Sequence, residues 1–82
     1  MTVLYRCAED NNLCMAECES IYIDENTVYL NLRNGSRHCK DIPVDRYESI
    51  MKSSIGYRSV DFSDYLFTSD YDSNGNYIGD EL

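Results

Sequence analysis

Hydrophobic and polar positions alternate most clearly between residues 21 and 33. The apolar residues there occupy every second position on both sides of a polar segment at residues 24–27: Ile21, Ile23, Val28, Leu30 and Leu32. A period of two is typical of a strand with one buried face. The pattern therefore predicts a hairpin, with a four-residue turn at residues 24–27 that places Ile23 opposite Val28.

A second tight turn follows at Asn34-Gly35. Asn-Gly is a strong hairpin signal because a two-residue type I′ turn needs positive φ at both positions. Such a turn would place Leu30 opposite Cys39, so we expect Cys39 on the packed face of the sheet. The other face would be wet, and would carry Tyr22, Tyr29, Asn31, His38 and Lys40.

Helical spacing follows this third strand. Pro43 suits a first helical turn, where a backbone N–H has no intrahelical partner to lose. Apolar residues then recur at positions 44, 47, 50 and 51, which predicts a helix that covers the packed face of the sheet and ends near residues 53–56. Residues 59–67 predict a second short helix with Ser59 as its N-cap.

The acidic segments at residues 1–19 and 69–82 are less patterned. Residues 2–7 predict a short strand with Val3, Tyr5 and Cys7 on one face. Residues 8–19 fit either a short helix or a loop with one helical turn, and residues 69–82 predict a turn-rich tail. The whole pattern predicts one α+β domain over residues 1–82, a small antiparallel β-meander of three to four strands covered by one main helix.

The charge of the chain is unevenly distributed. The formal net charge is −8, but residues 27–60 carry six basic and three acidic side chains, a local balance of +3. Residues 1–26 sum to −5 and residues 61–82 to −6. The overall field repels phosphate, which disfavours non-specific binding to DNA or to anionic membranes.

An acidic surface rich in tyrosine favours a protein partner with a basic surface. Eight of the ten aromatic residues are tyrosines, which supply large contact area at a low entropic cost. Carboxylates steer such a surface toward basic groups. We therefore expect the partner to bind at Asp61, Asp64, Tyr65, Asp70, Tyr71 and Asp72.

Residues 70–81 match several positions of an EF-hand loop, which makes calcium binding an alternative. The ligands would be Asp70, Asp72, Asn74, Asn76 and Glu81, around a sharp turn at Gly75. Against this, Tyr77 occupies a position that is normally aliphatic, and no exiting helix would follow Glu81. Apart from calcium, we expect no cofactor.

Basic residues around the second hairpin give another alternative: Arg33, Arg37, His38 and Lys40. Tyr22 and Tyr29 would share the wet face with two of them. Basic groups beside aromatic rings bind phosphate and stack bases in proteins that hold RNA or single strands. The net negative charge makes this the weaker alternative.

Five residues could supply zinc ligands: Cys7, Cys14, Cys18, His38 and Cys39. Their spacing is not C-x2-C, and the expected register points His38 and Cys39 to opposite faces. The chain opens with no signal peptide and has no membrane-spanning run, so we expect a cytoplasmic location. Reduced thiols are therefore favoured over zinc or disulfides.

The sequence shows none of the usual motifs of an enzyme active site. The chain has one histidine, no glycine-rich phosphate loop and no serine in a nucleophile elbow. No motif brings two carboxylates together for acid–base catalysis. We therefore expect a protein that is not an enzyme.

Several short features follow one another between residues 20 and 65. They are Ser20-Ile21 before a turn, the strand at residues 28–32, Asn34-Gly35-Ser36, Ile42-Pro43 with Tyr47 in the helix, Ser54-x-Gly56 and Tyr65. In this order they resemble the KTSC domain, a short α+β module of small bacterial and phage proteins. His38-Cys39-Lys40 stands where that domain has aromatics. The resemblance implies a compact fold that associates with nucleic acid or protein and has no established catalytic residues.

The sequence therefore predicts a small, acidic, non-enzymatic interaction protein. The resemblance adds that it is phage-encoded and that it binds and modulates or inhibits a host protein. A homodimer is a further expectation, because the strands at residues 2–7 and 36–40 would be exposed edges.

Overall fold

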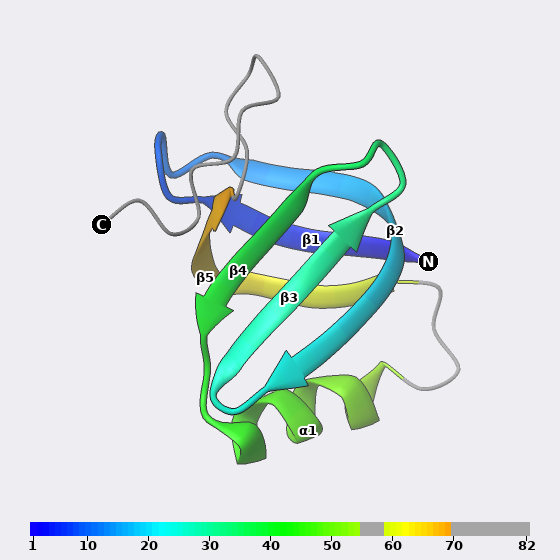
Figure 1. The fold of residues 1–82 in the computed structure, drawn as a ribbon, viewed down its shortest axis with the longest axis vertical. Coiled ribbons are helices and arrows are strands. Elements are labelled where there is room, and N and C mark those ends of the chain that lie inside the picture. Colours follow the sequence, from blue (N-terminus) through cyan, green and yellow to red (C-terminus); the bar gives the residue numbers. More distant parts are fainter. Residues whose placement is uncertain (55–58, 70–82) are drawn as a thin grey trace.

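The computed structural model describes residues 1–54 and 59–69, which form a closed barrel of five strands and one helix (Figure 1). The elements in chain order are β1 (Thr2–Cys7), β2 (Leu13–Asp24), β3 (Thr27–Leu32), β4 (Arg37–Asp41), α1 (Val44–Ser53) and β5 (Ser59–Ser69). Strands adjacent in this order pair antiparallel, and β5 also pairs parallel with β1. This last pairing closes the barrel.

The β2 strand takes part in both halves of the barrel. Its first part pairs with β1 and its second part with β3, and the two meet at a bulge between Cys18 and Ser20. The Cys18 thiol donates to the carbonyl oxygens of Ser20 (3.0 Å) and Asn31 (3.3 Å). Burial raises the pKa of this thiol, so it stays a protonated donor. A bulge bends and twists a strand, which lets β2 turn the corner of a small barrel.

The β5 strand carries a larger bulge. Tyr5 pairs with Phe62, but Arg6 pairs with Leu66, so residues 63–65 are additional on the β5 side. The Arg6 Nε donates to the carbonyl oxygen of Ser63 (3.0 Å). The backbone N–H of Ser63 donates in turn to the Asp61 carboxylate (2.9 Å). Beyond the bulge β5 reaches β4, so this feature is part of the closure of the barrel.

Side chains fill the interior, as expected for a barrel of this size. The buried residues are Val3, Tyr5, Cys18, Val28, Leu30, Leu32, His38, Ile42, Val60, Phe62 and Phe67. Aromatic rings meet edge to face at the centre, with Phe62 and Phe67 5.7 Å apart between centroids. Tyr5 contacts Phe67 at 6.0 Å and His38 at 5.0 Å.

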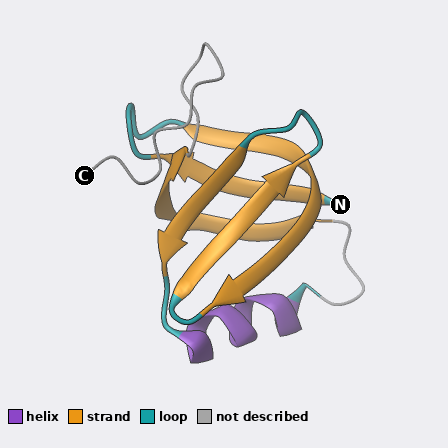
Figure 2. Cartoon of the chain, viewed as in Figure 1, coloured by secondary structure: helices purple, strands orange, loops and turns teal. Residues whose placement is uncertain are grey.

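The α1 helix lies across one end of the barrel (Figure 2). It begins after Pro43, whose carbonyl oxygen accepts from the Tyr47 N–H (3.0 Å). Tyr47, Ile50 and Met51 pack against the core, and the Tyr47 hydroxyl lies 3.5 Å from the carbonyl oxygen of Ile21. The predicted helix is therefore confirmed in position, with Pro43 at its start.

The predicted α+β meander covered by a helix is wrong. The described chain is mostly strand, and its strands close on themselves. The inner side of β3 and β4 is already covered by β1 and β5, so α1 has only an end of the barrel to close (Figure 1). None of its residues is fully buried for this reason.

The segment predicted as a second helix is strand β5. Val60 and Phe62 face the interior with a period of two, and Phe67 faces it again after the bulge. The bulge shifts the phase of the alternation, so that apolar positions 60, 62, 66 and 67 fit a helix when they are considered alone.

The helix or loop predicted at residues 8–19 is wrong from residue 13 onward. Cys14, Ala16 and Cys18 point toward the core in β2, at alternate positions. The period of two was hard to recognise in the sequence because the inward side chains of this part of β2 are small. The strand predicted at residues 2–7 is confirmed as β1, with Val3 and Tyr5 buried.

The two predicted registers have different outcomes. The first hairpin is confirmed, since Ile23 pairs with Val28. The predicted register of the second hairpin is wrong by one residue, because the loop has three residues instead of two. The Gly35 N–H donates to Leu32 O (3.1 Å), and the Leu32 N–H donates to Ser36 O (2.9 Å). Gly35 has a φ of 96°, as in a three-residue loop that ends in a bulged glycine.

This one-residue shift exchanges the sides of two side chains. His38 pairs with Leu30 and is buried, whereas Cys39 pairs with Tyr29 on the outer side. The predictions that Cys39 packs inside and that His38 is wet are therefore both wrong. The edge strands that motivated a homodimer are also paired, because β1 lies between β2 and β5, and β4 lies between β3 and β5.

Candidate functional site

The outer side of β1, β2 and β5 carries a group of exposed aliphatic side chains. Met15 of β2 pairs with Leu4 of β1. Arg6 of β1 pairs with Leu13 on the neighbouring strand β2 and with Leu66 on the neighbouring strand β5. Met15 is 72% exposed, Leu13 54% and Leu66 41%. We call Leu4, Leu13, Met15 and Leu66 the apolar face.

The apolar face follows from the alternation of the strands. Val3 and Tyr5 point into the barrel, so Leu4 between them points outward. In the first part of β2, before the bulge, the small side chains of Cys14, Ala16 and Cys18 point inward and the aliphatic side chains of Leu13 and Met15 point outward, the reverse of the usual arrangement in a strand with one wet side. Single exposed aliphatic residues are common, whereas contiguous groups of them are typical of interaction surfaces in proteins generally.

Carboxylates border the apolar face. Asp61 pairs with Leu4, and Glu17 follows Met15 on the same side of β2. Hydrogen bonds from Ser63 lower the pKa of the Asp61 carboxyl. A 2.6 Å hydrogen bond from the Thr2 hydroxyl, and then the N-terminal ammonium 3.9 Å away, lower the pKa of Glu17. Both side chains are therefore negative at neutral pH.

Arg6 lies within the apolar face, and two of its N–H groups donate to backbone carbonyl oxygens. Its Nε donates to Ser63 O and its Nη1 to Asn11 O, each at 3.0 Å. The guanidinium therefore joins the β5 bulge to the loop between β1 and β2. In the register of the strands Arg6 lies between Leu13 of β2 and Leu66 of β5.

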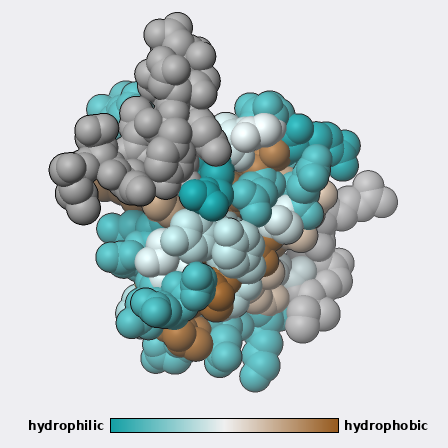
Figure 3. Space-filling view, in the orientation of Figure 1, coloured by the Kyte–Doolittle hydropathy of each residue, from teal (hydrophilic) through white to brown (hydrophobic). Residues whose placement is uncertain are grey.

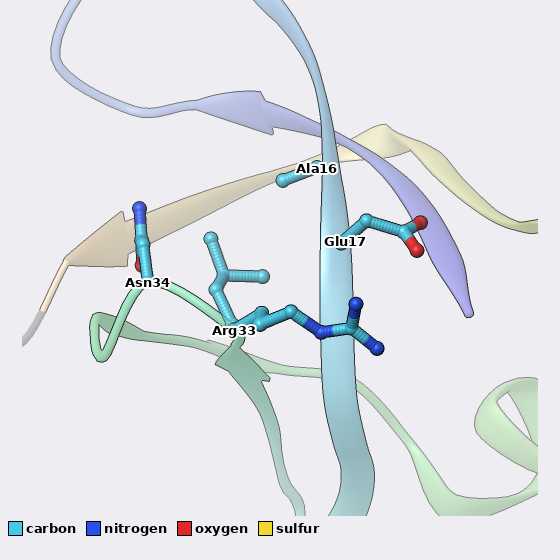
Figure 4. Close-up of a pocket in the computed structure, with 5 residues that line it drawn as sticks. Ala16, Glu17, Arg33 and Asn34 are labelled. Atoms are coloured by element: carbon cyan, nitrogen blue, oxygen red, sulfur yellow. The ribbon is translucent and has the colours of Figure 1, made fainter.

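A hollow of about 300 Å³ lies beside Glu17 (Figure 4), lined by Ala16, Glu17, Leu32, Arg33 and Asn34. The backbone N–H of Arg33 donates to the backbone carbonyl oxygen of Glu17 (3.0 Å). The positive charge of the Arg33 guanidinium also helps to lower the pKa of the Glu17 carboxyl. In the close-up the side chains of Glu17 and Arg33 extend to the same side of β2. These five residues include no thiol, hydroxyl or imidazole, and their ionisable groups are the Glu17 carboxylate and the Arg33 guanidinium.

A second cleft, of about 390 Å³, lies where β4 and β5 separate. Two residue pairs join these strands within the described chain, His38 with Ser69 and Cys39 with Thr68. The cleft is lined by Ala8, Cys39, Lys40, Asp41, Leu66 and Thr68. Since Leu66 also belongs to the apolar face, that face continues into a depression that a partner side chain can enter.

The outer side of β2, β3 and β4 has a different chemistry. The rings of Tyr22 and Tyr29 are stacked, with centroids 5.0 Å apart and an interplanar angle of 21°. The Arg37 guanidinium carbon lies 5.1 Å from the centre of the Tyr29 ring. We call these three residues the tyrosine face. Figure 3 looks onto this side of the barrel, where pale, weakly polar atoms gather over β3 and β4.

Three of the residues predicted to bind a partner lie in β5. Asp61 and Asp64 are exposed, and Asp61 borders the apolar face. Tyr65 is half-buried and packs against the core, so it supports the bulge. Asp70, Tyr71 and Asp72 lie outside the described residues, and so do all the predicted calcium ligands. The calcium alternative stays a prediction.

The residues predicted to hold nucleic acid do not form one surface. Arg37 lies against Tyr29 on the tyrosine face. His38 is inside the barrel beside Tyr5, and Lys40 lines the cleft between β4 and β5. Arg33 lines the hollow beside Glu17. The shifted hairpin register separates them.

The predicted zinc ligands are also separated. Cys18 is buried at the β2 bulge, and Cys39 lies on the outer side of β4. None of the four cysteines forms a disulfide. Within residues 1–54 and 59–69, no three His, Cys, Asp or Glu side chains are grouped to hold a metal ion.

The apolar face was missed at the sequence level. Leu13 and Met15 were assigned to a helix or loop, and Leu66 to a second helix. The alternation of small and large residues from Leu13 to Cys18 was the available signal.

No family model matches the chain, and no match was found among the curated proteins or the solved structures. The KTSC resemblance is untested by these comparisons. In the part of the chain that the structure describes, no helix is long and apolar enough to cross a membrane.

Proposed function

We propose that this protein is a non-enzymatic binding module that docks onto another protein through the apolar face. The observation that carries the proposal is Met15, which is 72% exposed and lies in register beside Leu4. A methionine side chain adapts its shape to different partners, and its burial removes a large apolar surface from water. An apolar centre with a polar border is the usual anatomy of a protein–protein interface.

Charge selects the partner. Asp61 and Glu17 border the apolar face, and hydrogen bonds favour the ionised form of each. A partner with an apolar patch bordered by lysine or arginine would complement both the centre and the edge. Two copies of this chain would instead bring like charges together, since its net charge is −8. We therefore favour a different, basic protein over a homodimer.

We place this activity in the cytoplasm, where thiols stay reduced, because none of the four cysteines is bridged. Binding at the apolar face would modulate or inhibit the partner by covering its surface. The phage origin implied by the KTSC resemblance would make this partner a host protein.

The test is quantitative capture from an extract of the cells in which the protein acts. The variant Leu13→Thr/Met15→Thr keeps β-branched, strand-compatible side chains but removes the aliphatic surface. Val44→Thr on α1 is the matched control, since Val44 is 40% exposed and lies away from the apolar face. We expect the control to retain the partner and the double variant to lose about tenfold or more of its affinity.

Two further measurements keep the test decisive. Circular dichroism should show that the double variant unfolds at the same urea concentration as the wild type, because its side chains are exposed. Sedimentation should show a monomer for both. Equal capture by wild type and double variant would overturn the proposal, and so would a dimer that depends on Leu13 and Met15.

A further inference from the structure

The tyrosine face is organised in three rows across β2, β3 and β4. The register places Tyr22, Tyr29 and Cys39 in the central row. On one side lies an acidic row of Asp24, Thr27 and Asp41, and on the other a row of Ser20, Asn31 and Arg37. The side chains of each row point outward because the residues between them point into the barrel.

The central row holds a stack that is open at one end. Tyr29 contacts both the Tyr22 ring and the Arg37 guanidinium. Because β2 and β4 flank β3, these two groups approach Tyr29 from opposite sides. Among residues 1–54 and 59–69, Tyr22 is therefore the last member of the stack, and its side chain is 39% exposed. Its outer ring face can receive another planar group.

The charge beside Tyr22 favours a cation. Asp24 follows Tyr22 on the same side of β2. Burial first, and then the Cys39 thiol, raise the pKa of the Tyr29 hydroxyl, and the charge of Asp24 adds a smaller contribution in the same direction. In the same row the Thr27 hydroxyl donates to the Asp41 carboxylate (2.9 Å). A phosphate at Tyr22 would meet these carboxylates, whereas a cation would be attracted by them and by the ring.

We propose that Tyr22 and Asp24 form a binding site for an arginine side chain of a partner peptide. The guanidinium stacks on the outer face of the Tyr22 ring and donates an N–H to the Asp24 carboxylate. The stack then runs from Arg37 through Tyr29 and Tyr22 to the bound arginine, with a guanidinium at each end. Arginine is preferred over lysine because its planar group can stack and form directed hydrogen bonds together.

This site lies on a different side of the barrel from the apolar face. It shares only strand β2 with that face, and the bulge between Cys18 and Ser20 separates the two parts of this strand. The inference therefore stands independently of the proposed docking at Leu13 and Met15.

The experiment is an NMR titration of the full chain with acetyl-Gly-Arg-Gly-amide. We expect the ring signals of Tyr22 and the backbone amide of Asp24 to shift together with one dissociation constant. The same peptide with lysine should bind more weakly. A citrulline peptide, which is planar but uncharged, should not shift these signals at the same concentration.

Variants separate the ring from the charge. Tyr22→Phe keeps the π face and should bind like the wild type, whereas Tyr22→Leu should bind about two- to fivefold more weakly. Asp24→Asn should also weaken binding, and Glu48→Gln on α1 should not, although both variants remove one negative charge. Equal binding by Tyr22→Leu and wild type would overturn the inference.

A single-stranded deoxythymidine octamer is the competing ligand, because nucleobases also stack on tyrosine. We expect it to leave the Tyr22 signals unchanged. If it shifts the signals of Tyr22, Tyr29 and Arg37 while the arginine peptide does not, the site binds single strands and the arginine assignment is wrong.

Discussion

Tyr5 is a titratable residue inside the barrel. Its ring contacts His38 and Phe67, and its side chain is 5% exposed. Burial, followed by the nearby thiols of Cys14 and Cys7, raises the pKa of Tyr5 to about 12. The folded state therefore holds this proton more tightly than the unfolded state, whose tyrosine titrates near pH 10.

This shift predicts how stability depends on pH. Below about pH 10 the folded and the unfolded state both keep the Tyr5 proton, so this residue does not make the free energy of unfolding depend on pH. Between about pH 10 and 12 only the unfolded state ionises, so stability falls as pH rises, by up to about 2–3 kcal/mol. Urea unfolding across this range should show a shallower fall for Tyr5→Phe. Parallel curves for the two proteins would show that Tyr5 is not the cause.

Gly35 and His38 show at the scale of single residues what the sequence could and could not reveal. Asn34-Gly35 correctly indicated a hairpin, since the backbone needs positive φ at Gly35. The same dipeptide fits a two-residue or a three-residue loop, and only the longer loop turns His38 inward. The choice between the two loop lengths depends on whether the interior of the barrel accommodates His38 or Cys39, and the local sequence does not contain this information.

Arg6 acts at the scale of elements, because it joins the β5 bulge to the loop between β1 and β2. Its two backbone acceptors, Ser63 O and Asn11 O, are each 3.0 Å away. Lysine keeps the charge but has no rigid fork with which to reach both.

We therefore expect Arg6→Lys to lower the free energy of unfolding by about 1–2 kcal/mol. Arg46→Lys, at an exposed position of α1, is the control and should change it by less than about 0.5 kcal/mol. Urea unfolding measures both values. If the two variants are equally stable, the guanidinium does not hold the bulge.

Elements built from neighbouring residues were accessible from the sequence, and those built from distant ones were not. The strand at Thr2–Cys7, the hairpin around Asp24 and the helix after Pro43 each depend on local patterns. Strand β5 depends on parallel pairing with β1, where Val3 meets Val60. Without that pairing, nothing in the local sequence of residues 59–67 requires an extended backbone, and the spacing of its apolar residues favours a helix.

At the scale of the whole molecule, closure of the barrel produces two outer sides with different chemistry. The parallel pairing of β5 with β1 brings Leu66 beside Arg6 and so completes the apolar face. The meander of β2, β3 and β4 produces the tyrosine face without help from β5. Of the candidate site, acidic residues such as Asp61 could be anticipated from charge. The outward side chains of Leu13 and Met15 could be recognised only from the weak alternation in the first part of β2, and the addition of Leu66 depends on the closure of the barrel.

The most direct test of the central claim asks which side of the barrel touches the partner. A photoreactive benzoylphenylalanine is placed at position 15 in one variant and at position 48, on α1, in another. On irradiation in the cell extract we expect position 15 to crosslink one basic protein and position 48 to crosslink none. Crosslinking of that protein from position 48 but not from position 15 would contradict the account.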